Sequence, residues 1–173
     1  MESVSMAGPD PDREGHVRVG ARAGKGLLGN AQPAAGKVHT GQWRLDTFAE
    51  LRLLRASLRQ AVAGQPLPDS AVFEDITQRL AIVATELATN AMAHTRPPTM
   101  VHLFRTTTTY LVEVKDNEPW LLPRFADEGY TGAGGLGLHM ARKLSVGMGW
   151  YADNGSKYVW AEVAISVATP WPR

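Results

Sequence analysis

Hydrophobic residues recur along this chain with two different periods, and the changes of period mark its predicted elements. Over residues 47–63 and 70–95 they recur every three or four positions, which predicts two amphipathic helices. Asp46 or Thr47 can cap the first helix, and Pro97 lies just beyond the second. The apolar stripe of the first helix comprises Phe48, Leu51, Leu54, Leu58 and Val62, and that of the second comprises Ile76, Leu80, Val83, Leu87 and Ala91.

Runs of β-branched and aromatic residues predict the strands. Residues 99–106 and 109–116 are joined by a short threonine-rich turn, which indicates an antiparallel hairpin. Residues 146–153 and 157–166 predict a second hairpin, closed across the favoured two-residue turn Asn154-Gly155. The remaining expected elements are a short first strand at 39–45 and a helix at 136–145.

The order of these elements predicts an α+β fold, a two-layer α/β sandwich with a mixed, mostly antiparallel sheet and helices on one face. We expect the domain to span residues 38–168, followed by a short C-terminal tail at 169–173. Residues 1–37 are rich in glycine, alanine, proline, arginine and aspartate and have almost no apolar periodicity, so a disordered tail is expected there.

Composition narrows the class of protein. A length of 173 residues and a hydrophobic fraction of 44% fit one globular domain with a core. The net charge of +1 gives no electrostatic case for binding nucleic acid or an acidic membrane surface, and the lack of cysteine excludes disulfides and thiolate metal sites. No run approaches the roughly 18 apolar residues that span a bilayer, and the first residues lack the apolar core of a signal peptide. A cytoplasmic location is therefore expected.

Glu86, Asn90 and His94 are spaced one helical turn apart, so they share one face of the second helix beside its apolar stripe. An asparagine oxygen can bind a hard cation such as Mg²⁺, which takes most of its other ligands from phosphates and water. Glu86 could accept a proton from an attacking hydroxyl, and His94 could contact phosphate. The alternative interpretation is a solvated helix edge with a histidine near the negative end of the helix dipole.

Two further features lie downstream. Asp116 ends a strand, where it could accept a hydrogen bond from an exocyclic amine such as that of adenine, or could be an ordinary turn residue. The sequence Gly134-Gly135-Leu136-Gly137-Leu138 leads into a helix, whose first amides can bind an anion. A Walker A loop and a dinucleotide fingerprint are both excluded by the flanking residues. The loop 118–133 between them could cover a ligand, and Arg124 in it could reach a terminal phosphate.

These motifs resemble those of the GHKL ATPases, which include gyrase B, histidine kinases and MutL. Glu86-x-x-x-Asn90 resembles the N-box, Asp116 the first glycine box and Gly134 to Leu138 the second glycine box. The form Glu-Leu-x-x-Asn-Ala-x-x-His and the closing Val-Trp-x-Glu-Val strand look like the bacterial anti-sigma-factor serine kinases (RsbW-like). The resemblance covers roughly residues 40–166.

The resemblance implies a Bergerat fold that binds ATP with Mg²⁺. By motif position, Asn90 would hold Mg²⁺, Glu86 would act as base and Asp116 would bind adenine. Gly135 and Gly137 would bind the phosphates. It further implies a serine or threonine kinase that phosphorylates an anti-anti-sigma-type partner, binds a sigma factor and can form a homodimer.

Two residues depart from the family pattern. Glu118 replaces the glycine of the first glycine box, and Tyr158 replaces a threonine or serine that helps to bind adenine through water. The alternative function is therefore a non-catalytic, partner-binding regulator with a degenerate nucleotide site. A third alternative is a plain ATP hydrolase.

Overall fold

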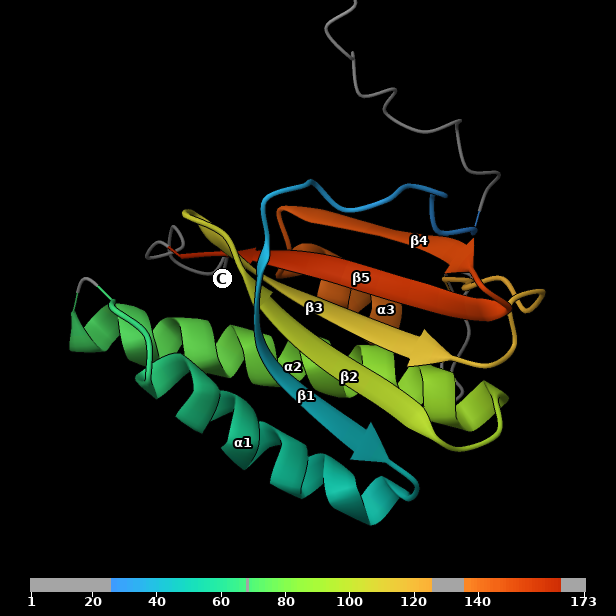
Figure 1. Ribbon diagram of the computed structural model, residues 1–173, viewed down its shortest axis with the longest axis horizontal. Helices are drawn as coiled ribbons and strands as arrows, with labels where there is room; N and C mark the ends of the chain where they lie inside the picture. Colours follow the sequence, from blue (N-terminus) through green and yellow to red (C-terminus); the bar gives the residue numbers. More distant parts are fainter. Residues whose placement is uncertain (1–25, 68, 126–135, 166–173) are drawn as a thin grey trace, which may run out of the picture.

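The computed structural model describes residues 26–67, 69–125 and 136–165, and within them the chain forms the expected α+β sandwich. The described strands make one five-stranded antiparallel sheet in the order β1-β2-β3-β5-β4, and α1, α2 and α3 cover one face of it (Figure 1). The elements are β1 (Val38–Leu45), a 3₁₀ turn (Phe48–Glu50), α1 (Leu51–Ala63), α2 (Ser70–His94), β2 (Thr99–Arg105), β3 (Thr109–Asp116), α3 (Gly137–Lys143), β4 (Gly147–Asp153) and β5 (Ser156–Ala164).

The core lies between the long helix α2 and the sheet. The predicted stripe of α2 is fully buried and packs against alternate residues of β2, β3 and β5. The core members contributed by α2 are Ile76, Leu80, Val83, Leu87 and Ala91, and those of the three strands include Val101, Leu103, Val112, Val114, Val159 and Ala161. The helical period of α2 and the alternating period of the strands therefore place the buried residues on the two surfaces that face each other.

One residue of the predicted first helix lies elsewhere. Phe48 is 54% exposed, whereas Leu54, Leu58 and Val62 of the same stripe are buried. The helix begins with a 3₁₀ turn, which is fixed because the Glu50 carboxylate accepts hydrogen bonds from the amides of Asp46 and Thr47 at 2.7 and 2.8 Å. The tighter turn takes Phe48 off the stripe.

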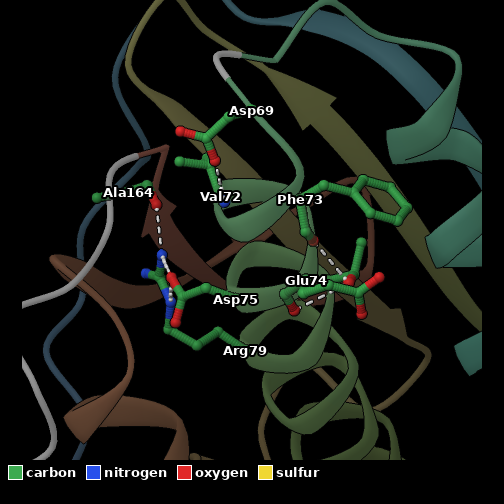
Figure 2. Close-up of polar contacts among 8 residues, drawn as sticks. Asp69, Val72, Phe73, Glu74, Asp75, Arg79 and Ala164 are labelled. Carbon is green, nitrogen blue, oxygen red and sulfur yellow. Dashed lines mark hydrogen bonds and ion pairs between the residues drawn. The ribbon is translucent and has the colours of Figure 1, made fainter.

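The N-terminal half of α2 is tied to the far end of β5 (Figure 2). Asp69 caps the helix by accepting a hydrogen bond from the amide of Val72 at 2.8 Å. Arg79 is buried, forms an ion pair with Asp75 and donates a hydrogen bond to the carbonyl of Ala164 at 3.0 Å. The N-terminal half of α2 therefore lies near the C-terminal end of β5. Its C-terminal half extends towards the opposite end of the sheet, where β3 ends and β5 begins.

Residues 26–37 differ from the predicted disordered tail. In Figure 1 this segment runs beside β4 and then crosses to β1. Gly29 and Ala31 exchange backbone hydrogen bonds with Trp150, and the indole groups of Trp150 and Trp160 donate to the carbonyls of Leu28 and Ala31 at 3.0 and 2.6 Å. Leu28 is 5% exposed. The prediction of a tail is therefore wrong for residues 26–37.

Residues 1–25 and 169–173, for which tails were predicted, lie outside the described part of the chain. In that part, each helix is either too short or too polar to cross a bilayer.

Replacing Leu28 with alanine tests the attachment of residues 26–31. Because the side chain is buried in the core, Leu28→Ala should lower the free energy of unfolding by about 2 kcal/mol or more. Val38→Ala is the control, since Val38 is 69% exposed and its truncation should change stability by less than about 0.5 kcal/mol. Urea unfolding of both variants measures the difference, and equal values would indicate that the segment is not docked.

Candidate functional site

A cavity of about 320 Å³ lies between the C-terminal half of α2 and the segment that follows β3. It brings together three residues that the sequence singled out, Asn90, His94 and Arg124. The complete lining consists of Asn90, His94, Trp120, Leu121, Leu122, Pro123, Arg124 and Lys157. The site therefore lies between the polar face of α2 and a largely apolar wall formed by residues 120–124 after β3.

Glu86 lies one turn before Asn90 and meets the start of α3. A Cβ atom added to Gly137 would collide with the Oε2 atom of Glu86 and would lie 3.3 Å from its Cδ atom. Glycine at this position therefore lets α3 approach α2 at the glutamate. The structure thus brings the N-box helix and the last glycine of the second glycine box into direct contact.

The other members of the glycine cluster divide into three groups. Leu138 is buried in the core at 3% exposure, where it holds α3 against the rest of the domain. Leu136, the residue before α3, is 70% exposed. Gly134 and Gly135 lie outside the described residues, so their predicted phosphate contacts stay a prediction.

Asp116 is almost fully buried, with 1% exposure. Its Oδ1 atom accepts a hydrogen bond from the Glu118 amide at 3.0 Å, and its Oδ2 atom lies 3.2 Å from the Lys157 ammonium. The second contact is an ion pair without the alignment of a hydrogen bond. Burial raises the pKa of the Asp116 carboxyl, and the Glu118 amide and Lys157 oppose that rise. Lys157, rather than Asp116, lines the cavity.

Lys157 is the residue of this site that the sequence analysis missed. The antiparallel register places it directly opposite Asp116, on the inward face of β5 that it shares with Val159, Ala161 and Val163. Its ammonium also donates to the carbonyl of Leu121 at 2.6 Å and to that of Glu118 at 3.5 Å. A lysine on the otherwise apolar inward face of this strand was the signal that could have found it.

Tyr158 does not face Asp116. It pairs with Lys115 on the opposite face of the sheet, where its ring stacks on that of Tyr151 with 4.8 Å between centroids. The side chain that faces Asp116 from β5 is that of Lys157. The register therefore separates the Tyr158 side chain from Asp116, and whether Tyr158 affects adenine binding stays a prediction.

The cavity wall is attached to two other parts of the fold. Phe125 is buried and packs on His139 of α3, with 5.0 Å between ring centroids. The Phe125 amide donates to the carbonyl of Gly26 at 2.8 Å, and the Leu28 amide donates to that of Pro123 at 3.1 Å. Arg124 lies exposed between these anchors. Residues 126–133, the rest of the predicted covering loop, lie outside the described part.

The donor set fits a magnesium nucleotide. The residues that the structure describes contain no group of three histidine, aspartate or glutamate side chains that could hold a metal by themselves. The carboxamide of Asn90 is at the cavity, and Mg²⁺ commonly takes one or two protein ligands and completes its shell with phosphate oxygens and water. The buried Oδ2 atom of Asp116 makes no aligned hydrogen bond, so an amine could use it as an acceptor where Lys157 shifts or shares the carboxylate.

Comparison with known families agrees with this geometry. The family model described as the histidine kinase-like ATPase domain matches residues 47–161, well over half of the chain. The chain therefore belongs to this family of the GHKL superfamily, and membership implies an ATP-binding domain. A search among curated proteins finds no match.

Gly137→Ala separates the stability of α3 from the position of Glu86. The new methyl group should displace the end of the flexible Glu86 side chain. Because alanine favours a helix by up to about 1 kcal/mol over glycine, the free energy of unfolding should stay equal or rise. Carboxyl NMR of Glu86 together with urea unfolding checks both expectations. A large loss of stability with an unchanged Glu86 signal would contradict the contact.

Proposed function

We propose that this protein is an ATP-binding regulator, an anti-sigma factor that phosphorylates a serine or threonine of an anti-anti-sigma-type partner. The observation that carries the proposal is the shared face of α2, where Asn90 lines the cavity and Glu86 meets the glycine at the start of α3. A carboxylate one turn before an asparagine that lines a cavity would provide a base beside a site for Mg²⁺. The resemblance to RsbW-like kinases supports the finer assignment, including the cytoplasmic location.

Each residue of the site would have its own role in nucleotide binding or phosphoryl transfer. Bound ATP supplies the phosphoryl group, with Mg²⁺ held by Asn90 and the phosphates. Asp116 would accept a hydrogen bond from the adenine amine, and the glycine amides, with His94 and Arg124, would contact the phosphates. Glu86 would accept the proton of the partner's hydroxyl. Phosphoryl transfer depends chiefly on such positioning and on charge stabilisation.

Calorimetric titration of ATP into the full chain tests the nucleotide site. Binding should require Mg²⁺, and Asp116→Asn should weaken it about tenfold or more, because a charged acceptor is lost. Asn90→Ala should remove most of the dependence on Mg²⁺. Asp153→Asn is the control, since Asp153 is exposed at the turn between β4 and β5. No binding at millimolar ATP would favour the non-catalytic alternative.

A second prediction concerns the base. Glu86→Gln should lower phosphate transfer from labelled ATP to an anti-anti-sigma-type protein by about 100-fold or more, because general-base catalysis contributes at least that much. ATP affinity should be unchanged. Glu74→Gln on the same helix is the control, because Glu74 is exposed and pairs with Arg59. Transfer at the wild-type rate by Glu86→Gln would exclude the assignment.

The alternative of a non-catalytic regulator has one observation in its favour. Asp116 is shielded from the cavity by Lys157, so an amine can reach it only if Lys157 shifts or shares the carboxylate. In that case partner binding would be independent of nucleotide and of Asn90→Ala. Steady phosphate release without any protein partner would instead indicate a plain ATP hydrolase.

A further inference from the structure

Lys157 is a buried lysine on the apolar inward face of β5, where lysine is rare. It is 3% exposed, and its four-carbon stem lies on the inward face of β5 among apolar neighbours. Its ammonium forms an ion pair with Asp116 Oδ2 at 3.2 Å and donates hydrogen bonds to the carbonyl oxygens of Leu121 and Glu118 at 2.6 and 3.5 Å. A buried ammonium survives only where such partners replace water.

The ion pair has a direct effect on Asp116. A carboxyl with 1% exposure would favour its neutral form, because burial disfavours the charged one. A protonated carboxyl has one acceptor oxygen replaced by a donor, so it offers less to an incoming amine. Lys157 is the cation paired with this carboxylate.

The same ammonium fixes the cavity wall. Glu118 is bonded at its amide to Asp116 and at its carbonyl to Lys157, and the Leu121 carbonyl is bonded to Lys157 as well. Both ends of the segment 118–121 are therefore attached to the Asp116–Lys157 pair. Leu121 itself lines the cavity, so the position of the wall depends on this attachment.

We propose that Lys157 is a positioning residue of the nucleotide site, which holds Asp116 as a charged acceptor for the base amine and fixes the wall at Leu121. The inference rests on the proposed nucleotide-binding function. Among the described residues, the other titratable side chains near the pair are Glu118 in the loop after β3, and His94 and Arg124, which line the cavity together with Lys157.

Three variants test the proposal. Lys157→Met removes the charge and the donors, and Lys157→Gln removes the charge but keeps a donor for the Leu121 carbonyl. Lys115→Met is the matched control, since Lys115 lies on the neighbouring strand but on the opposite face, near the ring of Tyr158. Urea unfolding establishes that each variant is folded, and Lys157→Gln serves if Lys157→Met does not fold.

Two measurements are made on each variant. Carboxyl NMR titration without ligand should give a higher Asp116 pKa in both Lys157 variants than in the wild type or in Lys115→Met. Calorimetry with Mg-ATP should then show, for each Lys157 variant, binding about tenfold weaker than that of the wild type at a pH one unit below the Asp116 pKa so measured, because only about a tenth of the carboxyl is ionised there. A second titration is made at a pH well above that pKa. The loss should be smaller at the higher pH, because the Asp116 carboxyl is ionised above its pKa. A purely structural role would weaken binding equally at both pH values.

The outcomes separate the two hypotheses. If the wild-type protein binds no nucleotide, the proposed function fails, and this inference fails with it. If the wild type binds and the Lys157 variants bind equally well with an unchanged Asp116 pKa, the inference alone fails. Tighter binding by Lys157→Met would also overturn it, because Lys157 would then be a competitor for Asp116.

Discussion

The structure depends on the packing of one long helix across one sheet. α2 buries its apolar stripe against β2, β3 and β5, and Asp69, Asp75 and Arg79 fix its first half at the end of β5. With that end fixed, the direction of the helix is determined, and its polar face emerges where β3 ends. The site is thus a consequence of core packing, since the residues that line it are placed by side chains that never touch it.

The sequence predicted the parts of the fold that rest on periodicity. The two long helices, both hairpins and the turn at Asn154-Gly155 are where the pattern placed them, because burial of one face requires that pattern. Residues 26–37 escaped prediction because they are held mainly by backbone groups and two indole donors. Contacts of that kind leave almost no hydrophobic signature in the segment itself.

The site could be predicted only in part, for a related reason. Asn90 and His94 share a helix face, so their spacing alone brings them to one cavity. Lys157 and Asp116 are brought together by the register of β3 and β5, which depends on hydrogen bonding between strands that are 40 residues apart in the sequence. The motif comparison instead singled out Tyr158, the residue after Lys157. Because neighbouring residues of a strand face opposite sides of the sheet, the side chain of Tyr158 lies on the other face from Asp116.

The docking of residues 26–31 has a consequence for where the domain begins. The matched family region starts at residue 47, yet Gly26 and Leu28 bond to Phe125 and Pro123, next to the cavity. The contacts of the fold therefore extend further towards the N-terminus than the matched family region. A truncated chain that begins at β1 would lose two anchors of the cavity wall while it kept every residue of the recognised motifs. Weak nucleotide binding by such a fragment would report on the missing segment beside β4 and not on the chemistry of the site.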